Sequence, residues 1–306
     1  MDFINSIVPL FSIIFIGFFC GKKQLLSEKQ NEGFEYFLFK VAIPCFLFST
    51  IMKTSIIQLI HWPYVFNYLF SFVLLACVIS IIFRAHCNLP HIAIRILASL
   101  YVNAAFYSIP VLFFILGDSK AAVIINVLQV AVIQLIFVFL LGVTTHEKKA
   151  PLRSHIIHAL ANPIIILPII GMVLSYIEIT VPIFLSNSIT SIGSGAAALA
   201  LFSFGMSLSA SDFSKAAFTK DLAIIVGIKN FIHPVVALIM GYYLFGLDRY
   251  WLIATLIMTA APTAIIIHFI SKRYDTDTRL VRNTVATTSV ISLLSIMLIY
   301  AAMDLF

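Results

Sequence analysis

Ten long runs of apolar residues are the feature that most restricts what this chain can fold into. A helix needs about 20 apolar residues to cross the hydrocarbon core of a bilayer. The runs are continuous rather than alternating between apolar and polar residues, so they predict helices and not the strands of a barrel. We therefore expect an all-α integral membrane protein with ten transmembrane helices. The runs cover residues 4–21, 34–52, 62–83, 92–116, 121–143, 160–177, 183–209, 222–246, 250–270 and 283–303.

The composition excludes several classes of protein. Hydrophobic residues make up 61% of the 306 residues and charged residues 10%, whereas a soluble domain has about 45–50% and about 25%. With so little polar surface, we expect neither a soluble enzyme, nor a nucleic-acid binder, nor a secreted disulfide scaffold. The expected partner of the outer surface is the lipid bilayer.

Lysine and arginine are distributed unevenly between the connections. Most of the 19, with Arg84 and Arg95 among them, are assigned to alternate connections, while Lys40 and Lys229 lie within apolar runs. Connections rich in these residues face the cytoplasm. The alternation predicts a multi-pass protein of the cell membrane, inner or plasma, with both termini outside the cytoplasm.

The sequence also contains an internal repeat. Residues 9–17 (PLFSIIFIG) and 163–171 (PIIILPIIG) share their first and last residues at an offset of 154, and Pro110 matches Pro262 at an offset of 152. Chance similarity between apolar stretches is the alternative. At the same offset of 154, four residues of the second run match the seventh: Leu47, Phe48, Ser49 and Met52 fall on Leu201, Phe202, Ser203 and Met206.

This repeat divides the chain near its middle. Residues 1–145 and 160–306 are the predicted halves, joined by a polar cytoplasmic connection at 146–159. Each half has five helices, an odd number, so the second half enters the membrane inverted relative to the first. Inverted repeats of this kind build many secondary transporters.

Prolines interrupt the fourth and ninth helices at corresponding places, Pro110 and Pro262. A helix broken at membrane depth is tolerated only inside protein or beside a water-filled cavity. Where two broken helices cross, the start of each second half offers N–H donors and about half a positive charge to an anion. The alternative is a pair of kinks with small polar residues joining helices. The polar residues nearest the breaks are Asn103, Tyr107, Ser108, Thr259 and Thr263.

Two further polar positions are weaker candidates for substrate binding. On the fifth helix, Gln129 shares a face with Asn126, and it either lines the cavity or bonds to a neighbouring helix. On the second helix, Ser49 follows a proline kink at Pro44.

All 13 acidic residues fall in connections or at the ends of runs. Because proton and sodium pathways usually rely on carboxylates within the membrane, their absence argues against a carboxylate-based antiporter or a sodium site with an acidic ligand. Lys229 either extends toward the cytoplasmic surface, which we favour, or attracts an anion. His233 is either a hydrogen-bonded structural residue or a proton carrier, and we favour the structural role.

Enzyme and metal signatures are poor. Residues 191–195 (SIGSG) lack both the spacing and the strand-to-helix context of a nucleophile elbow. His86, Cys87 and His91 share a connection, but no cluster of cysteines or acids accompanies them. We therefore expect no catalytic residues, no metal and no cofactor.

Taken together, the ordered motifs resemble the auxin efflux carrier family of membrane transporters, which includes plant PIN-type carriers and bacterial permeases. The similarity covers nearly the whole chain. The matching stretches are 41–48, 103–110, Asn162-Pro163, 200–208, 229–234 and 261–274.

The resemblance implies a fold like that of bile-acid sodium symporters. Helices 1, 2, 6 and 7 would form a scaffold, and helices 3–5 and 8–10 a transport domain that moves as an elevator in a homodimer. The family also implies organic anions as substrates, with the carboxylate at Pro110 and Pro262 and with Asn103 and Gln129 as side-chain ligands.

The favoured function is a secondary transporter of small organic anions, either carboxylates or auxin-like acids. The alternative is a channel-like pore or a ligand sensor without carrier activity. A sensor would normally carry an output domain, and the connection at 146–159 is too short to fold as one.

Overall fold

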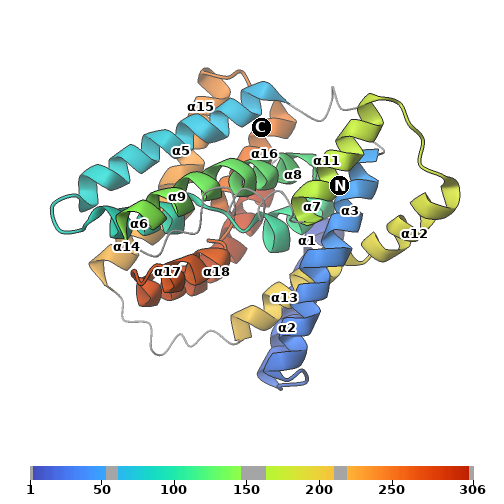
Figure 1. Ribbon diagram of the computed structural model, residues 1–306, viewed down its shortest axis with the longest axis horizontal. Helices are drawn as coiled ribbons and strands as arrows, with labels where there is room; N and C mark the ends of the chain where they lie inside the picture. The colour runs from blue at the N-terminus through green and yellow to red at the C-terminus, as the bar shows by residue number, and fades with distance from the viewer. Residues whose placement is uncertain (1–2, 53–60, 146–162, 210–218, 303–306) are drawn as a thin grey trace. The chain divides into compact units, whose positions relative to one another are not determined.

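The computed structural model describes residues 3–52, 61–145, 163–209 and 219–302, and in these ranges every regular element is a helix (Figure 1). Contacts divide the chain into two compact units. The first unit comprises residues 1–61, 105–132 and 153–210, and the second comprises 62–104, 133–152 and 211–306. The predicted connection at 146–159 lies outside the described residues.

The first unit contains the beginning of each predicted half of the chain. The π-helical turn η2 (Ala104–Ser108) leads into it from the second unit. Its helices are α1 (Phe3–Lys22), α2 (Glu28–Phe37), η1 (Leu38–Ala42), α3 (Ile43–Met52), α7 (Ile109–Leu116), α8 (Lys120–Leu128), α11 (Pro163–Tyr176), α12 (Ile183–Gly193) and α13 (Ala196–Ser209).

The second unit contains the remaining helices. The π-helical turn η3 (Gln129–Ile133) joins α8 to this unit. Its helices are α5 (Trp62–Phe83), α6 (Leu89–Leu100), α9 (Gln134–Thr144), α14 (Lys220–Gly227), η5 (Ile228–Ile232), α15 (His233–Tyr243), α16 (Arg249–Ala260), α17 (Ile266–Arg273) and α18 (Thr278–Ala301).

Several helix ends carry the signals expected from their sequences. Ser27 begins α2 with a capping box that includes Gln30. Asp248 begins α16 by accepting the N–H of Trp251 (3.2 Å), and Thr219 begins α14 in the same manner. Gly117 ends α7 with a φ of 77°, a conformation that glycine adopts without strain. These caps fix where the helices begin and end.

Helical segments occupy all ten predicted apolar runs, but they differ in length. Among the described residues, five are long and apolar enough to cross a bilayer: Trp62–Phe83, Lys120–Thr144, Ile183–Ser209, Lys220–Tyr243 and Thr278–Ala301. Shorter apolar helices lie at Val8–Lys22, Leu89–Leu100, Ala104–Leu116 and Ile166–Tyr176. The described residues are thus all-helical and consistent with the predicted integral membrane protein, whereas the count of ten spans and the inverted repeat stay predictions.

Three of the π-helical turns end two residues before a proline. They are η1 before Pro44, η2 before Pro110 and η5 before Pro234. A proline in a helix lacks an N–H and clashes with the carbonyl four residues earlier. Shifting the preceding hydrogen bonds to a longer spacing accommodates that clash without ending the helix.

This accommodation corrects one prediction. We expected the fourth helix to break at Pro110, but Pro110 is the second residue of α7, and the helical path continues through it from η2. The interruption lies earlier, at Tyr101–Asn103, directly after α6. In the ninth helix the break does include Pro262, between α16 and α17.

Glycines bring α1 and α13 of the first unit into close contact. A Cβ atom at Gly17 would overlap the carbonyl oxygen of Phe202, and one at Gly205 would overlap the carbonyl oxygen of Ile14. Gly21, four residues after Gly17, faces the same helix at Ser209. Small residues at this spacing let two membrane helices approach until their backbones touch.

The repeat-related helices pack in a reciprocal manner. While Gly17 of α1 faces Phe202 of α13, Gly171 of α11 faces Phe48 of α3, with a Cβ position 3.3 Å from the Phe48 ring. The offset of 154 converts Gly17 into Gly171 and Phe48 into Phe202. Each half therefore packs its first helix against the second helix of the other half.

Candidate functional site

Two interrupted helices of the second unit meet where each is broken. Val102 and Thr263 form an antiparallel bridge. The N–H of Asn103 donates to the carbonyl of Pro262 (2.8 Å), and the N–H of Ala264 donates to the carbonyl of Tyr101 (3.2 Å). We call these two segments, residues 101–103 and 261–264, the crossover.

The carbonyl end of α6 is closed by side chains at the crossover. The hydroxyl of Thr263 donates to the carbonyl of Ala98 (2.6 Å). The hydroxyl of Tyr68 on α5 donates to the carbonyl of Leu100 (3.3 Å). Helix ends leave four carbonyls without helical partners, and buried ones need others. Here protein side chains supply them.

The carbonyl end of α16 is closed in the same manner. The Nζ of Lys229 donates to the carbonyl of Thr259 (2.9 Å), and the hydroxyl of Ser292 on α18 donates to the carbonyl of Ala260 (2.7 Å). The hydroxyl of Thr259 itself donates to the carbonyl of Thr255 in its own helix (2.7 Å). Both helix ends at the crossover thus have partners from neighbouring elements.

The beginning of α17 has N–H donors that remain available. The N–H of Thr263 donates to the hydroxyl of Thr288 (3.1 Å). The N–H groups of Ile265 and Ile266 have no acceptor among the described residues. These two residues are also exposed, at 40% and 39%. The start of a helix carries about half a positive charge, so this end can receive an anion.

The structure brings together part of the predicted site in the second unit. Asn103, Pro262 and Thr263 lie in the crossover, all buried, with Asn103 9% exposed. Lys229 and Thr259 contact each other beside it. The two helices therefore meet at their interruptions as expected, but the expected cause holds for Pro262 alone, because Pro110 is not at the crossing.

Lys229 does not extend toward the surface. Its side chain has no exposed area. It lies nine residues after the start of α14 at Lys220, about 13 Å along a helix, which is farther than a lysine side chain reaches. The prediction that favoured an extended lysine is therefore wrong, and the ammonium remains inside the protein.

His233 also differs from its predicted role. The side chain is fully buried, but neither ring nitrogen has a hydrogen-bond partner among the described residues. Its ring lies 6.1 Å from that of Tyr68. The described residues therefore do not hold His233 by hydrogen bonds, as the favoured structural role required.

The other predicted ligands lie in the first unit. Tyr107 is buried, with its ring 5.1 Å from that of Phe204. Ser108 is buried before α7, and its hydroxyl has no partner among the described residues. Gln129 is fully buried at the start of η3. The half-buried Ser49 donates its hydroxyl to the carbonyl of Phe46.

Sequence reasoning missed the contribution of the tenth helix. Thr288 and Ser292 of α18 both bind backbone groups of the crossover or its flanking helix end. Together with Thr284 they recur every four residues and so share one face of the helix. That spacing was the available signal, since small hydroxyl residues joining helices follow such a stripe.

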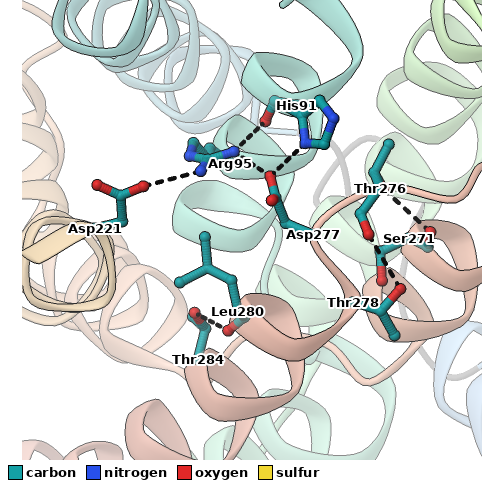
Figure 2. Close-up of polar contacts among 9 residues, drawn as sticks. All are labelled: His91, Arg95, Asp221, Ser271, Thr276, Asp277, Thr278, Leu280 and Thr284. Carbon is teal, nitrogen blue, oxygen red and sulfur yellow. Dashed lines mark hydrogen bonds and ion pairs between the residues drawn. The ribbon is translucent and has the colours of Figure 1, made fainter. Parts of the chain in front are cut away.

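A second polar cluster joins three helix starts of the second unit (Figure 2). The guanidinium of Arg95 on α6 pairs with Asp277, directly before α18, and with Asp221 on α14 (2.9 Å). Nδ1 of His91 lies 2.8 Å from Asp277. We expected Arg95 in a cytoplasmic connection, but it lies within α6 and is buried, with its side chain 7% exposed.

This cluster borders a cavity of about 560 Å³. Arg95 and Arg279 contribute two positive charges to its lining, and Asp221, Asp275 and Asp277 contribute three negative ones. The guanidinium also lies 5.0 Å from the ring of Phe83. The acids outnumber the arginines, so the cavity does not favour anions, and the cluster serves to hold α6, α14 and α18 together.

Among the described residues, no three histidine, cysteine or acidic side chains lie close enough to hold one metal ion. His91 and Asp277 do lie together, but the Asp277 carboxylate already accepts a hydrogen bond from Arg95.

Comparison with known proteins identifies the family. A family model described as "Membrane transport protein" matches residues 2–300. The chain is also 23% identical over 252 residues to the "Uncharacterized transporter YfdV" of Escherichia coli (strain K12), covering 78% of each protein. The proteins of that name from Escherichia coli O157:H7 and Shigella flexneri match to the same extent.

The family model spans nearly the whole chain, including the crossover and the Arg95 cluster. It describes membrane transporters and not enzymes, and with the apolar helices it indicates a multi-pass membrane protein. The chain therefore belongs to the membrane transport protein family, whose auxin efflux carrier-like members its sequence motifs resemble.

Proposed function

We propose that the protein is a secondary transporter of small organic anions, either carboxylates or auxin-like acids, and that the substrate carboxylate binds at the crossover. The observation that carries this proposal is the meeting of two broken helices with donor groups left at the start of α17. In secondary transporters, such helix starts point at anionic substrate groups.

The proposed ligands are backbone and amide groups. The N–H groups of Ile265 and Ile266 would bind the carboxylate oxygens, and the side chain of Asn103 would provide a further donor. The carbonyls around them already have hydrogen-bond donors, so the crossover has little to offer a cationic substrate. This imbalance favours an anion.

The reciprocal packing in the first unit supports an inverted repeat. Gly17 lies against the backbone of Phe202 and Gly171 against the ring of Phe48, so the same two positions meet in both pairs at the offset of 154. Chance similarity of apolar sequences does not require matched residues to exchange partners in this way. Inverted halves fit a carrier that alternates between two equivalent orientations.

We further propose that transport proceeds by an elevator motion in which the second unit carries the substrate. The crossover lies wholly in that unit, which keeps it intact during a movement of the unit as a body. The homodimer implied by the family resemblance, and the orientation with both termini outside the cytoplasm, remain parts of the proposal.

Transport is tested by reconstituting the purified protein in liposomes and screening radiolabelled mono- and dicarboxylates and indole-acetate-like acids for uptake. We expect saturable uptake of at least one acid, reduced tenfold or more by Asn103→Ala. Asn187→Ala, at an exposed position on α12, is the matched control and should transport normally. Uptake that Asn103→Ala leaves unchanged would place the substrate elsewhere.

A channel-like pore and a ligand sensor are the alternatives. Planar-bilayer recordings distinguish the first, because a channel shows single-channel currents far above the turnover of a carrier. Equilibrium binding of an acid without any uptake would favour the second.

A further inference from the structure

The position of Lys229 suggests how the proposed transport is coupled, and the inference rests on the proposed function. Lys229 lies in η5, in the middle of the long helical segment Lys220–Tyr243. It has no exposed area, and among the described residues its one hydrogen bond goes to the carbonyl of Thr259. A fully buried ammonium is costly unless its charge is balanced.

Among the residues that the structure describes, no carboxylate provides that balance. The ion pairs of the described second unit involve His91 and Arg95 with Asp221 and Asp277. Lys229 instead contacts the penultimate residue of α16. The end of a helix carries about half a negative charge, and a cation is stabilised there.

The same place has a known use in other transporters. The carbonyl ends of broken helices, together with carbonyls of the unwound backbone, coordinate the sodium ion or proton that drives transport. In this chain the corresponding carbonyls bind protein donors: Thr259 binds Lys229, Ala260 binds Ser292 and Pro262 binds Asn103. A coupling ion would have to displace these donors.

We propose that the ammonium of Lys229 is a built-in counter-cation at the crossover. It holds the position of a coupling alkali ion and balances the charge of the bound carboxylate. Transport is then independent of sodium and potassium.

The surroundings of Lys229 indicate how to test this role. Asn230 has a buried side-chain oxygen without a partner among the described residues, and both ring nitrogens of His233 are likewise unpartnered. Truncating Lys229 to alanine leaves a space next to the carbonyl of Thr259, on the same helical segment as these acceptors. A small alkylammonium ion can occupy that space, whereas Lys229→Met fills it without a charge.

The experiment measures carboxylate uptake into proteoliposomes with all sodium and potassium replaced by N-methyl-D-glucamine. Wild-type uptake should stay within twofold of its value in sodium. Lys229→Ala should lose at least tenfold and regain severalfold with ethylammonium or propylammonium. Lys229→Met should lose as much without regaining any. Lys40→Ala, at the half-buried lysine of η1, is the control and should respond to no amine.

Two results would overturn the inference: wild-type uptake that requires sodium or potassium, or Lys229→Met that transports like wild type. If the wild-type protein transports no acid under any condition, the proposed function fails instead. The thermal unfolding of the same variants in detergent then decides on Lys229. We expect alkylammonium ions to raise the unfolding temperature of Lys229→Ala and not that of Lys229→Met; equal behaviour of the two variants contradicts the counter-cation.

Discussion

Replacing Thr263 by valine tests whether the closed carbonyl end of α6 stabilises the crossover. Thr263 has no exposed area, and its hydroxyl donates to the carbonyl of Ala98 at 2.6 Å. Valine has nearly the same shape but no hydroxyl, so the packing is kept and the hydrogen bond is lost. A buried acceptor left without a donor costs about 1–3 kcal/mol. We expect Thr263→Val to lower the free energy of unfolding by that amount.

Thr284→Val is the matched control. Thr284 is equally buried, but its hydroxyl donates to the carbonyl of Leu280 in its own helix. That carbonyl also accepts the helical N–H, so removing the hydroxyl leaves it with a partner. We expect a loss well below 1 kcal/mol.

The assay is unfolding by sodium dodecyl sulfate in mixed micelles, followed by tryptophan fluorescence. The chain has two tryptophans, Trp62 and Trp251, and Trp251 is buried at the start of α16. A Trp62→Phe background leaves Trp251 as the sole reporter of the second unit. If Thr263→Val and Thr284→Val unfold alike, the carbonyl of Ala98 does not depend on Thr263, and the reasoning is refuted.

Three further predictions concern other parts of the chain. Gly17→Ala should destabilise the protein by about 1–3 kcal/mol in the same assay because its Cβ meets backbone of α13, whereas Gly33→Ala, which meets nothing within 4 Å, should not. Arg95→Gln should cost about 1.5–3 kcal/mol by removing two charged hydrogen bonds, and the exposed Arg84→Gln should change stability by less than about 0.5 kcal/mol. With the other three cysteines replaced by serine, Cys87 should react with an impermeant maleimide only from the cytoplasmic side, and labelling from outside would contradict the predicted orientation. Because partial burial raises the pKa of the Cys87 thiol, labelling at pH 9 should be much faster than at pH 7.

The helices were predictable because hydropathy alone decides which segments a bilayer accepts. The break in the ninth helix was also predictable, since Pro262 marks it. The break in the fourth helix was not, because residues 101–103 include neither glycine nor proline. The antiparallel pairing with residues 261–264 creates that break, and such pairing joins segments about 160 residues apart.

The roles of charged residues were less predictable than their positions. Lys229 and Arg95 each interact with partners far along the chain, Thr259 in one case and Asp277 in the other. Sequence position suggested a surface for both, since long side chains near helix ends usually reach water. Whether a charge is buried depends on which helix end or acid the fold brings to it.

The exchanged packing of α1 with α13 and of α11 with α3 also bears on how such a chain arises and assembles. A protein made of one half alone would leave both of its helix faces in these contacts uncovered. Two copies of that half, inserted into the membrane in opposite directions, would cover each other through the same pair of contacts. In the predicted inverted repeat, the fused chain corresponds to such a dual-topology dimer joined into one molecule, so we expect the halves expressed as separate polypeptides to need each other to accumulate.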